Sequence, residues 1–216
     1  MGLLFRSHPW HGVPIGDRSP EVVTAYIEMT PTDTVKYELD KTTGILKIDR
    51  PQLYSSVCPV LYGLVPQTYC AERVADLCMM RNGTTGIIGD GDPLDICVLT
   101  EKHISHGNVL MQVIPIGGLR MLDGNEADDK IIAVMQNDAA YKDWRSVEDC
   151  PDSLVVRLRH YFLTYKQSPD AMYRECDITH VYGREEAHEV IRRSQQDYSA
   201  HFAGIEDALG RALRRE

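Results

Sequence analysis

Residues 90–95 read Asp-Gly-Asp-Pro-Leu-Asp, and the apolar residues that follow continue as far as position 99. Gly and Pro are typical of a loop, and a short continuous apolar run is typical of a buried strand. Clustered carboxylates repel one another, so their proximity indicates a bound cation, and all-oxygen ligands select hard ions such as Mg²⁺, Mn²⁺ or Ca²⁺. The segment therefore predicts a cation-binding loop at the start of a buried strand. A solvated polar turn is the alternative.

A calcium-binding loop between two helices is a further alternative for this segment. Counted from Asp90, the twelfth position of such a loop is Glu101, which is an acid as required. The sixth position must be Gly because the loop turns sharply there, but in this chain it is Asp95. Residues 94–100 also have the pattern of a strand, whereas the calcium loop must enter a helix. Both observations disfavour this alternative.

The composition is that of an ordinary soluble globular protein. The 216 residues are 43% hydrophobic and 25% charged, which predicts a single domain over 1–216. The net charge of −9 disfavours a nucleic-acid-binding protein, whose affinity rests on Lys and Arg at phosphates. No apolar run approaches the roughly 20 residues of a membrane span, so no membrane partner is expected. The N-terminus lacks a signal-peptide core and the six Cys lack CxxC spacing, so we expect a cytoplasmic location.

Hydrophobic patterns in the first two thirds of the chain are mostly those of strands. Strands are predicted over residues 22–29, 35–40, 45–48, 94–100, 108–116 and 130–135. The second and third of these form a hairpin, and Gly117-Gly118 marks the end of the fifth. Residues 1–20 are expected to form an irregular lead-in, 54–63 an irregular or extended stretch, and about 70–89 a surface insertion.

After residue 150 the hydrophobic period changes to that of helices. Apolar or aromatic side chains recur every three or four positions at Leu154, Leu158, Tyr161 and Tyr165. A second helix is predicted to begin near Gly183, within a C-terminal helical segment over about 184–216. Strands first and helices last indicate an α+β fold that is mainly β. We expect an OB-like five-stranded β-barrel core with the C-terminal helices packed outside.

A second group of acids lies between two predicted strands. It comprises Asp123, Glu126, Asp128 and Asp129, and Lys130 follows directly. Two acidic loops at one end of a barrel can share metal ions, and paired metals can hold both the attacking and the leaving oxygen of a phosphoryl transfer. By itself this second group also fits a solvated turn.

The combination of these motifs resembles the family I soluble inorganic pyrophosphatases. Residues 90–95 match the family signature D-x-D-P-x-D, and residues 36–41 match its N-terminal hairpin. Further matches are Arg50, Tyr62-Gly63, the second acidic loop with Lys130, and the helix end at Tyr165-Lys166. The similarity runs from about residue 21 to 166 and continues more loosely through the helix near 184–195.

The resemblance implies a role for each matching residue. Asp90, Asp95 and Asp128 would hold the activating metals, with Asp95 bridging two of them. Asp123 and Asp128 would take a metal that arrives with the substrate. Glu28 and Glu38 would assist through direct or water-bridged contacts, and Asp92 would be the general base or the acid that orients the attacking water. The two phosphates would be bound by Lys36, Arg50, Tyr62, Lys130, Tyr165 and Lys166.

The implied reaction is Mg²⁺-dependent hydrolysis of inorganic diphosphate to two orthophosphates by direct attack of a metal-activated water. The resemblance implies several Mg²⁺ ions per active site, Mn²⁺ as a substitute, Ca²⁺ as an inhibitor, and a homo-oligomer that is a hexamer or a dimer. One residue departs from the family pattern, because Cys58 stands where the family usually has Tyr.

Two other functions remain as alternatives. The first is a non-catalytic OB-like binding module whose acids hold structural Ca²⁺; the acidic net charge disfavours the nucleic-acid groove that such a module would need. The second is hydrolysis of a nucleotide or another organic diphosphate, and no Gly-rich phosphate loop or base-stacking motif supports it.

Overall fold

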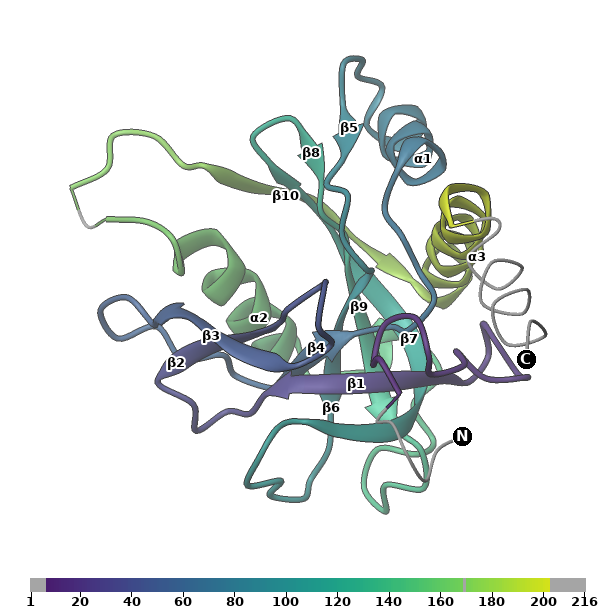
Figure 1. The fold of residues 1–216 in the computed structure, drawn as a ribbon. Helices are drawn as coiled ribbons and strands as arrows, with labels where there is room; N and C mark the ends of the chain where they lie inside the picture. The colour runs from purple at the N-terminus through teal and green to yellow at the C-terminus, as the bar shows by residue number, and fades with distance from the viewer. Residues whose placement is uncertain (1–6, 169, 203–216) are drawn as a thin grey trace.

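Five strands close into a barrel in the computed structural model, which describes residues 7–168 and 170–202 (Figure 1). Around the ring they are β1 (Val23–Met29), β4 (Leu61–Leu64), β6 (Asp95–Leu99), β9 (Lys130–Met135) and β7 (Val109–Asp123), and β7 pairs with β1 to close it. Neighbouring strands are antiparallel except β6 and β9. β6 and β9 are apolar and buried along almost their whole length, as expected for strands covered on both faces. The OB-like five-stranded barrel is confirmed.

β7 is longer than the sequence pattern predicts, because it continues through Gly117-Gly118 to Asp123. The two glycines allow another strand to approach closely. A Cβ atom at Gly117 would lie 2.5 Å from the carbonyl oxygen of Tyr182, and one at Gly118 would lie 2.5 Å from the Tyr182 ring. Tyr182 belongs to β10 (Cys176–Gly183), which pairs antiparallel with β7. β10 was not predicted from the sequence, and the predicted end of the strand at the glycines is wrong.

The hairpin predicted from alternation consists of β2 (Val35–Leu39) and β3 (Leu46–Pro51), which form a separate two-stranded sheet. The stretch 54–63, predicted to be irregular or extended, runs into the barrel strand β4. Two short strands, β5 (Ile88–Gly89) and β8 (Glu126–Ala127), pair with each other beside the barrel.

The expected surface insertion at 70–89 contributes to the core. It contains α1 (Glu72–Asn82), whose side chains Val74, Ala75, Leu77 and Cys78 are buried in the same hydrophobic cluster as the barrel strands. The interspersed charged residues of this helix obscure its amphipathic pattern in the sequence. α1 ends at Gly83, which has a φ of 64°, a conformation that suits glycine.

The other two α-helices lie outside the barrel. α2 (Asp152–Thr164) lies on one side, and α3 (Arg184–His201) packs with α1 on the other (Figure 1). A short 3₁₀ helix, η1 (Val147–Asp149), precedes α2. The predicted order of strands first and helices last is wrong, because α1 precedes three barrel strands and β10 separates α2 from α3.

The lead-in is held by Trp10, which is 4% exposed and whose indole N–H donates to the carbonyl of Thr68 at 2.7 Å. Residues 1–6 of the lead-in and 203–216 of the expected C-terminal helical segment lie outside the described residues. Within the described part of the chain, no helix has the length and hydropathy that crossing a bilayer requires.

Candidate active site

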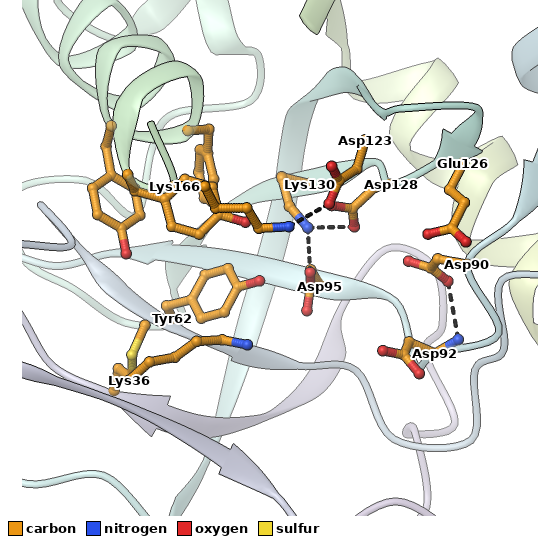
Figure 2. A pocket seen from close by; sticks show the side chains of 14 residues that line it. Lys36, Tyr62, Asp90, Asp92, Asp95, Asp123, Glu126, Asp128, Lys130 and Lys166 are labelled. Atoms are coloured by element: carbon orange, nitrogen blue, oxygen red, sulfur yellow. Dashed lines mark hydrogen bonds and ion pairs between the residues drawn. The ribbon is translucent and has the colours of Figure 1, made fainter. Parts of the chain in front are cut away.

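A pocket of about 160 Å³ brings together both acidic loops, the β2–β3 hairpin, β4 and α2 (Figure 2). Ten of the residues to which the resemblance assigns a role line it: Lys36, Tyr62, Asp90, Asp92, Asp95, Asp123, Asp128, Lys130, Tyr165 and Lys166. Glu28 and Glu38 line a smaller adjoining pocket of about 80 Å³, which shares Lys36, Tyr62, Asp92 and Asp95. Arg50 lines neither pocket, but its guanidinium carbon lies 5.5 Å from the centre of the Tyr165 ring.

The first acidic loop is shaped by a turn within itself. The main-chain N–H of Asp92 donates to the carboxylate of Asp90 at 2.9 Å, and Gly91 between them has a φ of 73°, where a side chain would be strained. Asp95 is the first residue of β6, so its carboxylate projects from the end of a buried strand. The turn and the strand end together direct the three carboxylates of this loop toward one pocket.

The second acidic loop reaches the same pocket through strand register. β6 and β9 are parallel, and Asp95 is paired with Lys130, the first residue of β9. Side chains alternate along an extended chain, so Asp128 and Lys130 face the pocket while Asp129 points into the core, where it is 2% exposed. The register therefore places carboxylates from both loops around one lysine.

Two lysines contact carboxylates in the pocket (Figure 2). The ammonium group of Lys130 contacts both Asp95 and Asp128, and that of Lys166 contacts Asp123. Burial by itself lowers the pKa of Lys130, but the charges of Asp128 and Asp95 raise it well above its usual value. Lys130 therefore stays protonated although it is only 2% exposed.

The site carries more negative charge than its lysines neutralise. Burial, with the neighbouring charge of Asp128, raises the pKa of Asp90. Burial also raises the pKa of Glu28 to about 8, although the main-chain N–H of Leu39 donates to this carboxylate at 2.7 Å. Buried carboxylates that resist ionisation are stabilised by an added cation. The electrostatics of the pocket thus favour binding of positive charge.

The donor set fits a hard divalent cation, because every candidate ligand is a carboxylate oxygen. Among the described residues, no three His, Cys, Asp or Glu side chains already stand at metal-binding distance from one another. Lys130 contacts Asp95 and Asp128, and Lys166 contacts Asp123, so these carboxylates have lysine partners.

Aromatic side chains form one wall of the pocket. Tyr62 is buried, and this burial raises the pKa of its phenol well above the usual value, so it remains a hydroxyl donor. Tyr161 of α2 and Tyr165, the residue that caps the end of α2, stack with ring centroids 5.2 Å apart. Burial likewise raises the pKa of Tyr165. Protonated phenols of this kind can donate hydrogen bonds to an anion.

Three residues that line the pocket had no site role predicted from the sequence: Met29, Tyr161 and Phe162. Glu126, which also lines it, was predicted only as a member of the second acidic group. Tyr161 lies one helical turn before Tyr165 and so shares its face, a periodicity that would have indicated it. Lys41, which contacts the carboxylate of Asp92, likewise had no site role predicted from the sequence. Cys58, at the position where the resemblance expects Tyr, is 1% exposed in the core cluster that contains Tyr161 and is not among the pocket residues.

Comparisons with known proteins identify the family of this chain. The family model described as inorganic pyrophosphatase matches residues 25–199. The inorganic pyrophosphatase of Chlamydia muridarum is 50% identical over 199 residues, covering 90% of this chain and 95% of its own length. The soluble inorganic pyrophosphatase 2 of Chlamydomonas reinhardtii is 34% identical over 196 residues, covering 91% of each chain.

The fold is also similar to that of solved inorganic pyrophosphatase structures. The crystal structure of inorganic pyrophosphatase from Thermus thermophilus superposes with a TM-score of 0.74 at 29% identity, covering 90% of this chain and 99% of that one. With the family match over most of its length and the relatives described above, this chain belongs to the inorganic pyrophosphatase family.

Proposed function

We propose that this protein hydrolyses inorganic diphosphate to two orthophosphates in a Mg²⁺-dependent reaction, by direct attack of water. Membership of the inorganic pyrophosphatase family supports the reaction class. The observation that carries the proposal is one pocket in which carboxylates from two loops stand beside Lys36, Lys130 and Lys166. Carboxylates can hold the metals, while the lysines suit a substrate with several negative charges.

In this proposal Asp90, Asp95 and Asp128 hold the activating metals, and Asp123 with Asp128 holds a metal that accompanies the substrate. Glu28 and Glu38, in the adjoining pocket, act through direct or water-bridged contacts. When bound, Mg²⁺ supplies neutralisation of the diphosphate charge and a lower pKa of bound water, and Mn²⁺ can take its place.

Asp92 accepts the proton of the attacking water or orients that water. It is 43% exposed at its side chain, so solvent reaches it, and its main-chain N–H is fixed by Asp90. Lys41 contacts its carboxylate and so helps to hold it in place. Among the described pocket residues no Ser, Cys or His offers a nucleophile, which supports direct attack by water.

The cations and phenols bind the phosphates and stabilise the leaving group. Lys130 and Lys166 are already held in place by their carboxylate partners, so little conformational freedom is lost when phosphate oxygens replace those partners. Lys36 approaches from the hairpin, and Tyr62 and Tyr165 donate from the aromatic wall. Arg50, beside Tyr165, completes the set at the rim.

The test is phosphate release from diphosphate with and without Mg²⁺. We expect release with Mg²⁺, slower release with Mn²⁺, and inhibition by added Ca²⁺, because the larger ion acidifies its bound water less. Equal turnover with Ca²⁺ alone contradicts the metal assignment, and no release with any of the ions contradicts the reaction. Parallel assays with nucleoside diphosphates test the alternative substrate class.

We also propose that the protein is a cytoplasmic homo-oligomer, a hexamer or a dimer, as the resemblance implies. Its six cysteines are all free and buried, which fits a reducing compartment. Size-exclusion chromatography with light scattering gives the assembly mass, and a monomer at assay concentration contradicts this part of the proposal.

A further inference from the structure

The segment immediately before α1, residues 68–71, lies against the first acidic loop, and we refer to it as the clamp segment. Its residue Cys70 makes two main-chain hydrogen bonds to that loop. The N–H of Cys70 donates to the carbonyl of Asp92 at 2.8 Å, and the N–H of Gly91 donates to the carbonyl of Cys70 at 3.0 Å. The backbone on both sides of the turn between Asp90 and Asp92 is therefore fixed from outside the loop.

The same segment also holds the two ends of the loop. The N–H of Leu94 donates to the buried hydroxyl of Thr68 at 2.9 Å. At the other end, Gly89 is so close to the clamp segment that a Cβ atom there would overlap the main chain of Cys70 and Ala71. Movement of the clamp segment is thus transmitted to the acidic loop as a whole.

The clamp segment is in turn fixed by a carboxylate on another helix. α1 has Ala71 at its N-cap, so its own sequence provides no side chain to accept the first N–H groups. Asp197 of α3 provides it instead: its Oδ2 accepts from the N–H groups of Ala71, Arg73 and Val74 at 3.1, 3.1 and 3.2 Å. Its Oδ1 accepts from the guanidinium of Arg73 at 2.9 Å.

Asp197 is only 2% exposed, and a second contact from the same helix supports it. The N–H of Tyr69 donates to the carbonyl of Ser194 on α3 at 2.9 Å. Along the clamp segment, the N–H groups of Tyr69 and Ala71 are therefore bound by α3, and that of Cys70 between them is bound by the acidic loop. α1 and α3 also lie side by side in Figure 1.

We propose that Asp197 is a positioning residue for the acidic loop, acting through the clamp segment on Asp90 and Asp92. The inference rests on the proposed function, in which these acids bind metal and handle water. If Asp197 is lost, three N–H groups at the partly buried start of α1 lose their acceptor, and the clamp segment must move or open for water to replace it. The main-chain contacts of Cys70 with Asp92 and Gly91 then loosen, and metal ligands lose their alignment.

The experiment compares Asp197→Ala and Asp197→Asn with Val113→Ala. Asn keeps one oxygen that can accept the N–H groups, so it should retain part of the function and remain folded if Ala does not. Val113 is fully buried in the barrel strand β7, and shortening it removes core volume without removing a hydrogen bond. It therefore controls for lower stability alone.

Three measurements are made on each variant: Mg²⁺ affinity by calorimetry in the absence of diphosphate, amide hydrogen exchange over residues 89–94, and the Mg²⁺ concentration for half-maximal phosphate release. We expect Asp197→Ala to weaken Mg²⁺ binding roughly 10- to 100-fold, as loss of a supporting partner of metal ligands typically does. Exchange over 89–94 should accelerate, and Asp197→Asn should lie between Ala and the unmodified protein. Val113→Ala should change neither the affinity nor the exchange.

Equal Mg²⁺ affinity and equal loop exchange in Asp197→Ala and Val113→Ala overturn the inference, because Asp197 would then contribute only to overall stability. If Asp197→Ala does not fold, unchanged affinity and exchange in Asp197→Asn overturn it in the same way. Failure of the proposed function has a different signature: the unmodified protein then releases no phosphate and binds no Mg²⁺, while the exchange measurement still tests whether Asp197 orders the loop.

Discussion

The guanidinium of Arg120 and the carboxylate of Asp129 form an ion pair inside the core. Nη2 of Arg120 lies 3.0 Å from Oδ2 of Asp129, and the two side chains are 0% and 1% exposed. The hydroxyl of Tyr182 donates to the same carboxylate at 3.0 Å. Because Asp129 stands between Asp128 and Lys130, this pair fixes the backbone from which two pocket side chains project.

Arg120→Met should strongly destabilise the protein. It leaves the carboxylate of Asp129 buried without its counter-ion, and breaking a buried pair in this way typically costs about 3–5 kcal/mol. Urea denaturation followed by circular dichroism measures the loss. The control is Arg192→Met, since Arg192 pairs with Glu189 at the surface, where it is 48% exposed, and its loss should cost less than about 1 kcal/mol. Equal losses of unfolding free energy in the two variants would show that the buried ion pair contributes no more to stability than the exposed one.

Asp95→Asn and Asp92→Asn should impair phosphate release in different ways, the first through Mg²⁺ binding and the second through kcat. Asp95 is a proposed metal ligand, so its amide variant should need much more Mg²⁺ and remain poor even at saturation. Asp92 is proposed to act on the water, so its variant should keep more of its Mg²⁺ affinity while kcat falls by roughly 10²–10⁴, the usual contribution of a positioned base. Metal titrations together with kcat at saturating Mg²⁺ separate the two effects.

One result for Asp92→Asn would contradict the role proposed for Asp92. If Asp92→Asn recovers full kcat at high Mg²⁺, then Asp92 is a metal ligand and another group must handle the water. Lys102→Gln, at an exposed lysine that pairs with Glu101 and is not among the pocket residues, serves as the control for an unrelated change of charge.

His11 should make the protein less stable in mild acid. Its ring stacks on Trp10 with centroids 4.3 Å apart, and its Nδ1 lies 2.8 Å from the hydroxyl of Tyr198. Burial, together with the nearby His8, lowers the pKa of His11 from 6.5 to about 4. The unfolded chain therefore binds a proton below pH 6.5 that the folded chain does not, and stability falls as the pH drops from about 6.5 toward 4.

Because the His11 ring is only partly buried, solvent screening reduces the effect, and we expect a loss of roughly 1 kcal/mol between pH 7 and pH 5. Thermal unfolding of the unmodified protein and of His11→Gln at both pH values isolates this contribution, since all other titrating groups are common to the two. An equal pH dependence in both would show that His11 does not titrate with folding.

The sequence by itself determined the parts of the protein that depend on local pattern. The alternation in β2 and β3, the apolar runs of β6 and β9, and the helical periods of α2 and α3 each lie within one short stretch of chain. The loop at 90–95 likewise carries three acids, a Gly and a Pro within a few positions. Such features express backbone and side-chain preferences that hold before any tertiary contact forms.

Only the tertiary structure decided which distant segments meet. The register of β6 with β9 places Asp95 beside Lys130, and the approach of Tyr182 explains why Gly117 and Gly118 lie within a strand and do not end it. The sequence of α1 contains many charged residues, so it does not reveal which face is buried. Packing against the barrel and α3 decides that face. Asp197 accepts the N–H of Ala71 from 126 residues away, because Ala71 offers no side-chain acceptor at the start of α1 and only folding brings a carboxylate there.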